Sequence, residues 1–76
     1  MIRYDDHAEF QIKRRDIDKA WIEDTILNPD EIETSSGRRS FLKCLMGRHV
    51  ALRVVTPLND PNYVITAYFD RTKPCV

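Results

Sequence analysis

The chain has few glycines, few cysteines and no long apolar segment. Its 76 residues include two glycines and two cysteines, while 42% of the residues are hydrophobic. The glycines stand alone in the sequence, which excludes a glycine-rich loop of the kind that cradles phosphate groups. No apolar run approaches the ~20 residues that a membrane-spanning helix needs, so we expect no membrane association. A chain of this length forms one domain, and we assign residues 1–76 to it.

Metal ligands are equally scarce. His7 and His49 have no partner cysteine, histidine or carboxylate at the spacing of a metal site, so we predict no metal and no cofactor. The first residues lack the basic and apolar regions of a signal peptide, and we therefore expect a cytoplasmic protein. In that reducing compartment Cys44 and Cys75 are expected to be free thiols. Cys44 would be a small core residue within a strand.

The net charge is zero, but the charges are unevenly distributed. Residues 1–34 carry ten acidic and five basic side chains, whereas residues 35–76 carry two acidic and seven basic ones. If these halves form different faces, the second gives a basic sheet that can meet phosphate groups or an acidic protein. Alternatively, the strand cations are ordinary solvated residues that discourage aggregation. The pI of about 6.7 counts against a strong nucleic-acid binder.

Helical spacing of apolar residues dominates the first third of the chain. It predicts one helix over residues 4–15, with Asp5 or Asp6 as the N-cap, and a second over residues 19–27. An Asn-Pro pair at residues 28–29 ends the second helix, because the residue before proline avoids the helical region. The first three residues form either a short edge strand or an unstructured start.

After the Asn-Pro pair the apolar residues alternate, which predicts strands. The expected strands cover residues 30–34, 39–46, 48–56 and 63–70, and short connections make neighbouring strands antiparallel. The segment 48–56 is the most regular of them, because it is rich in β-branched residues and contains neither glycine nor proline. The tail over residues 71–76 is expected to be loose.

The expected fold is therefore α+β, with two N-terminal helices packed on one face of an antiparallel sheet of about four strands. The covered face is expected to hold Leu42, Cys44, Val50, Leu52, Val54, Ile65, Ala67 and Phe69. The open face is expected to carry Arg39, Phe41, Lys43, His49, Arg53, Thr66 and Tyr68. A shift of one residue in any strand would exchange its two faces.

Several short patterns occur in a characteristic order between His7 and Tyr68. They include His7-Ala8, Arg15 with Ile17, Asn28-Pro29, Arg39 with Phe41 and Lys43, Arg53-Val54, and Thr66 with Tyr68. In this order the chain resembles a small bacterial family of unknown function, which is similar in fold to the RelE/ParE and BrnT toxins. The chain departs from the family pattern at Gln11, Ile12 and Asp16, where Arg, Met and Gly are usual. The loss of the arginine at Gln11 weakens any binding role there, and Asp16 requires a turn without left-handed geometry.

The resemblance implies a RelE/ParE-like toxin-type domain whose working surface is the open sheet face. Toxins with this fold include ribosome-dependent mRNA endonucleases and gyrase poisons, and a partner antitoxin covers the working surface. We therefore expect a toxin-like protein of a toxin–antitoxin pair, in particular an mRNA endonuclease that acts on RNA or at the ribosome. One alternative is a non-catalytic module that binds an acidic protein through the same face. Another is a homodimer that pairs through an exposed edge strand.

RNA cleavage without a metal needs a base, cations for the phosphorane and an acid for the leaving oxygen. The catalytic candidates are Arg53, Tyr68 and His7, so the expected enzyme is a metal-independent ribonuclease. The RNA-binding candidates are Arg39, Phe41, Lys43, Arg48 and Arg53. Structural roles compete with these: an Arg and a Tyr on adjacent strands commonly form a packing pair, and His7 can simply tie the helix start to the sheet.

Overall fold

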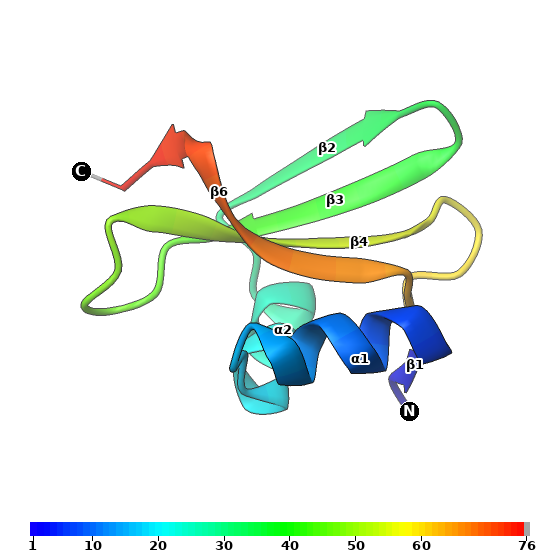
Figure 1. The fold of residues 1–76 in the computed structure, drawn as a ribbon. Helices are drawn as coiled ribbons and strands as arrows, with labels where there is room; N and C mark the ends of the chain where they lie inside the picture. The colour runs from blue at the N-terminus through cyan, green and yellow to red at the C-terminus, as the bar shows by residue number, and fades with distance from the viewer. Residues whose placement is uncertain (76) are drawn as a thin grey trace.

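The computed structural model describes residues 1–75, in which two helices pack against one face of a four-stranded antiparallel sheet (Figure 1). The elements are β1 (Arg3–Tyr4), α1 (Asp6–Arg14), α2 (Lys19–Leu27), β2 (Glu31–Ser35), β3 (Arg38–Lys43), β4 (Val50–Pro57), β5 (Tyr63–Val64) and β6 (Thr66–Pro74). The strand order of the larger sheet is β2-β3-β4-β6, and β1 pairs in parallel with β5. This architecture confirms the predicted α+β fold. Neither α1 nor α2 has the length and apolar character that crossing a bilayer requires.

The helix ends follow from local side-chain chemistry. Asp5 is the N-cap of α1, and its carboxylate accepts a hydrogen bond from the backbone N–H of His7. Asp18 caps α2 in the same way, through the backbone N–H of Ala20 at 2.8 Å. Between the helices Asp16 has a φ of 55°, which lies in the left-handed region. The expectation that Asp16 avoids this geometry is wrong, because the aspartate adopts it in place of glycine.

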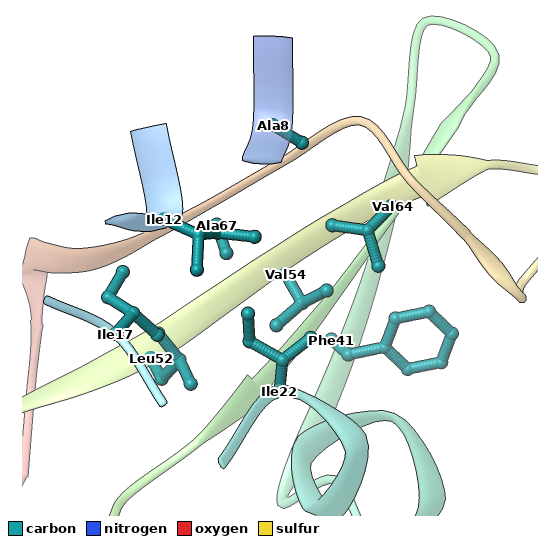
Figure 2. Packing of buried hydrophobic residues seen from close by; sticks show 9 residues of the cluster. All are labelled: Ala8, Ile12, Ile17, Ile22, Phe41, Leu52, Val54, Val64 and Ala67. Atoms are coloured by element: carbon teal, nitrogen blue, oxygen red, sulfur yellow. The ribbon is translucent and has the colours of Figure 1, made fainter. Parts of the chain in front are cut away.

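The hydrophobic core lies between the helices and the sheet (Figure 2). Figure 2 shows side chains from the helical segment converging on those of the strands, and each is at most 5% exposed: Ala8, Ile12, Ile17, Ile22, Phe41, Leu52, Val54, Val64 and Ala67. Leu52, Val54 and Ala67 lie in this core and Phe69 packs against it, as predicted for the covered face. Val50 and Ile65 do not belong to the core, and Val64 is buried there in place of Ile65. The helices therefore occupy one side of the sheet, and no helix covers the other side within residues 1–75.

Strand β3 has the opposite facing from the one expected. Phe41 pairs with Val54 and lies under the helices, whereas Leu42 pairs with Arg53 on the other face. The prediction that placed Leu42 on the covered face and Phe41 on the open face is therefore wrong. Alternation could not decide between them, because both side chains are apolar and both are buried, at 4% and 2% exposure.

The C-terminal segment is ordered, in contrast to the expected loose tail. β6 continues to Pro74, which pairs with Val50 of β4 after a register irregularity at Val50 and Ala51 (Figure 1). Residue 76 lies outside the described residues. A disulfide joins Cys75 to Cys44, so the expectations of free thiols and of a core Cys44 within β3 are wrong. Disulfides are typical of oxidising compartments, and the cytoplasmic location stays a prediction.

Candidate functional site

Arg53, the expected centre of a basic face, is surrounded by carboxylates. Its Nε donates a hydrogen bond to Asp70 at 2.7 Å, and its Nη1 lies 3.1 Å from a Glu33 oxygen. Lys73 in turn pairs with Glu33 and, at 3.5 Å, with Glu31. We call these five residues the Arg53 network. Because it holds three acids and two bases, the open face is not basic at this point.

The protonation equilibria of the network favour its charged form. Hydrogen bonds from the Thr72 hydroxyl and backbone N–H, together with Arg53, lower the pKa of Asp70 to about 2. A hydrogen bond from Lys73, with a further one from Arg53, also lowers the pKa of Glu33. Burial opposes the charge of Arg53, but the two carboxylates outweigh burial and raise the pKa of this guanidinium. Arg53 therefore stays charged and paired with the carboxylates of Asp70 and Glu33.

Three of the predicted RNA-binding residues lie on the helix side of the sheet. Phe41 is a core residue, and Arg39 and Lys43 alternate with it along β3 and therefore share its face. The ammonium of Lys43 donates to the Asn28 carbonyl at 2.9 Å and lies 3.2 Å from the Asp24 carboxylate. The expectation that these three side chains line the open face is wrong. All three face the helices because Phe41, which lies between the other two on β3, pairs with the core residue Val54.

The remaining predicted cation, Arg48, lies away from Arg53. Its guanidinium is 5.2 Å from the centre of the Trp21 ring and 4.6 Å from that of Phe69. Phe69 shares the helix side of the sheet with Leu52. The five predicted RNA-binding residues thus occupy two opposite faces and do not form one surface.

A different polar cluster forms where α1 lies beside β6 (Figure 1). His7, Gln11 and Arg15 recur every four residues, so they follow one line along the helix and its C-cap. Side chains of this line reach Thr66 and Tyr68 on β6. We call these five residues the α1–β6 cluster. It unites two of the predicted catalytic residues, His7 and Tyr68, with an arginine other than Arg53.

Gln11 organises the α1–β6 cluster. Its Oε1 accepts hydrogen bonds from the Arg15 guanidinium at 3.1 Å and from the Thr66 hydroxyl at 2.7 Å. With both donors on the oxygen, the amide nitrogen points to Nε2 of His7 at 2.9 Å. Because an amide nitrogen can only donate, Nε2 of His7 accepts and the ring proton lies on Nδ1. The cluster therefore holds one proton-accepting nitrogen in a defined position.

Arg15 is held in place by uncharged groups. Its Nη1 donates to the Ala67 carbonyl at 3.0 Å as well as to Gln11, and its guanidinium lies 5.9 Å from the centre of the Tyr68 ring. None of the ion pairs among residues 1–75 includes Arg15. Arg15 therefore keeps an uncompensated positive charge in a fixed position, as an oxyanion or phosphate site requires.

A surface hollow of about 400 Å³ opens along the same side of α1. It is lined by His7, Phe10, Gln11, Arg14 and Arg15, and none of these side chains is acidic. A smaller hollow of about 130 Å³ lies beside the disulfide, but the two lysines in its wall already bind carboxylates. The hollow on α1 is therefore the better candidate for binding an anion.

Sequence reasoning missed Gln11, Arg15 and Thr66 as members of the site. The four-residue spacing from His7 to Arg15 was the available signal, because it places these side chains in one line on the helix. What the spacing could not reveal is that this line faces β6. Tyr68 is also the cross-strand neighbour of Arg53, so it stands between the cluster and the Arg53 network.

The family described as "Domain of unknown function (DUF4258)" matches residues 4–69. The chain belongs to the DUF4258 family. The matched region contains every residue of the α1–β6 cluster, and the predicted membership in a family of unknown function is confirmed. No curated protein and no solved structure matches this DUF4258 domain.

Proposed function

We propose that this DUF4258 domain is a toxin-like protein that binds RNA and cleaves it by metal-independent acid–base catalysis at the α1–β6 cluster. The observation that carries the proposal is the fixed guanidinium of Arg15, which belongs to no ion pair, lies over the Tyr68 ring and is linked to His7 through Gln11. A developing phosphorane carries negative charge, and a preorganised cation beside proton-transfer groups stabilises it strongly. Arg15 takes the role that the sequence had suggested for Arg53.

The chemistry assigns one role to each side chain. Nε2 of His7 accepts the proton of a ribose 2′-hydroxyl that has replaced the Gln11 amide as its partner, and the 2′-oxygen attacks the adjacent phosphorus. Arg15 stabilises the charge on the phosphorane oxygens. The bond from phosphorus to the 5′-oxygen breaks, and the Tyr68 hydroxyl donates its proton to that oxygen. The products are a 2′,3′-cyclic phosphate and a free 5′-hydroxyl, after which solvent returns the proton from His7 to Tyr68.

The toxin assignment draws its support from the resemblance to RelE/ParE and BrnT toxins. That resemblance leads one to expect two N-terminal helices on an antiparallel sheet, which is the arrangement of this chain. In such a pair an antitoxin would cover the hollow on α1 and mask Arg15. A requirement for the ribosome belongs to the same proposal, and assays with and without ribosomes separate the two cases.

The test compares cleavage of a labelled RNA by the purified wild type, Arg15→Ala, Tyr68→Phe and the control Lys13→Ala, with and without ribosomes. Lys13 is a basic residue of α1 outside the hollow, so it controls for the loss of one positive charge. We expect Arg15→Ala and Tyr68→Phe each to cleave about 100-fold more slowly, and Lys13→Ala to stay within about twofold. Mass spectrometry should detect the cyclic phosphate. Wild-type protein that leaves RNA intact in both assays, or equal cleavage by Arg15→Ala, would contradict the proposal.

A second candidate is a non-catalytic protein-binding module, which the free edge of β2 favours. β2 lies at one border of the sheet, and its Ile32 is 50% exposed. An extended peptide can add to such an edge as a further strand. Two copies paired through β2 would bring Glu31 and Glu33 of each chain together, which disfavours a homodimer. A pull-down that loses its partner with Ile32→Lys would support this candidate, and native mass spectrometry showing dimers would contradict the argument against self-association.

A further inference from the structure

Phe10 is the one strongly exposed apolar residue of α1. The side chain is 62% exposed, whereas Ala8 and Ile12 of the same helix are buried in the core. A single exposed phenylalanine is ordinary on a protein surface. This one differs because it forms part of the wall of the hollow on α1.

The neighbours of Phe10 in that wall are cationic or neutral. His7 and Arg14 lie three residues before and four residues after it, so both flank the ring on the helix surface. Arg14, like Arg15, takes part in none of the ion pairs among residues 1–75. The hollow thus combines an accessible aromatic face with two unpaired guanidinium groups.

We propose that the hollow binds single-stranded RNA, with one nucleobase stacked on Phe10 and the adjacent phosphates held by Arg14 and Arg15. This inference rests on the proposed function and names its substrate class. A nucleotide is the ligand that joins a planar ring to an anion at the spacing of one sugar. Bases within a duplex are already stacked on their neighbours, so only an unpaired strand can offer a base to the ring.

The number of cations limits the electrostatic part of binding. Two phosphate contacts on a single strand predict a slope of about −1.4 for the logarithm of the binding constant against the logarithm of salt concentration. Such a shallow slope agrees with a chain of zero net charge. Stacking on Phe10 must then supply much of the affinity, which makes the phenylalanine the residue to test.

The experiment measures binding of a fluorescein-labelled, 2′-O-methyl RNA octamer by fluorescence anisotropy. The methyl group blocks cleavage, so binding is observed separately from catalysis. We expect Phe10→Ala to weaken binding of the octamer about tenfold and to leave binding of inorganic polyphosphate unchanged, because only the base stacks. Phe10→Trp should bind the octamer at least as tightly as the wild type, and Lys13→Ala should stay within about twofold.

Arg14→Ala supplies the electrostatic half of the test. It should weaken the binding of both RNA and polyphosphate and make the salt slope shallower by about 0.7. Equal octamer affinity of Phe10→Ala and wild type, or a hairpin duplex that binds as tightly as the single strand, would overturn the inference. Octamer binding that depends on Phe10 without cleavage of unmodified RNA would uphold the inference and defeat the proposed catalysis. Cleavage of RNA at the same rate by Phe10→Ala and the wild type would uphold the proposed catalysis and overturn the inference.

Discussion

Arg15 and Arg53 lie on either side of Tyr68 and have opposite surroundings. Arg53 is enclosed by Asp70 and Glu33, whereas Arg15 bonds only neutral oxygens and the Tyr68 ring. The first arginine uses its charge to hold the sheet together, and the second keeps its charge available for a ligand. The partners of an arginine therefore decide whether it can bind phosphate, more than its position on a strand does.

The disulfide gives the largest expected effect on the Arg53 side. It closes a loop of 31 residues and fixes the end of β6, which carries Lys73 into the Arg53 network. The Cys44→Ser and Cys75→Ser double variant should lose about 3 kcal/mol of unfolding free energy, measured by urea denaturation. At temperatures where it stays folded, its RNA affinity should match that of the wild type. A loss of RNA affinity in the folded double variant would show that the two regions are not independent.

The second-largest effect is expected from acid, which should weaken the Arg53 network. The folded-state pKa of Asp70 is about 2, below its ordinary value of 3.8, so its contribution to stability is complete above about pH 4. That contribution is lost as the pH falls from about 4 to about 2, because protonation then favours the unfolded chain. Thermal melts between pH 7 and pH 2 should show this decline, with a smaller decline for Asp70→Asn. Identical pH profiles of the two proteins would remove Asp70 from the account.

The smallest expected effect lies next to Arg15. Asp16 adopts a left-handed φ of 55°, which glycine adopts without a steric cost. Glycine also adds freedom to the unfolded chain, so Asp16→Gly should raise the unfolding free energy by less than about 1 kcal/mol. Urea denaturation measures the change, and RNA cleavage should be unaltered. A destabilised variant would mean that the aspartate side chain contributes more than its backbone strain removes.

The sequence was sufficient for the architecture. The change from helical to alternating spacing near Pro29 placed both helices before the four strands of the larger sheet. It was insufficient for the face of β3, because Phe41 and Leu42 are both apolar neighbours. The disulfide also could not be predicted from the sequence, because only the path of β6 in the folded chain brings Cys75 to Cys44.

The expectation of a basic open face was wrong because the charges were counted in two halves of the chain. Dividing the chain at residue 34 assigned Glu31 and Glu33 to the helical half, yet both lie on β2 within the sheet. There they meet Arg53 and Lys73 and cancel the basic character that was expected. Charges near a boundary between elements must be assigned to the sheet or helix that carries them before a surface can be called basic.

The most direct test of the account measures stability and RNA cleavage together for Arg15→Ala and Arg53→Ala. We predict that Arg53→Ala loses about 3 kcal/mol of unfolding free energy, because it leaves buried Asp70 without its partner. Its folded fraction should cleave RNA within about threefold of the wild type. Arg15→Ala should lose about 100-fold in cleavage and little stability. Equal cleavage by Arg15→Ala and wild type, or a fully folded Arg53→Ala that no longer cleaves, would contradict the account.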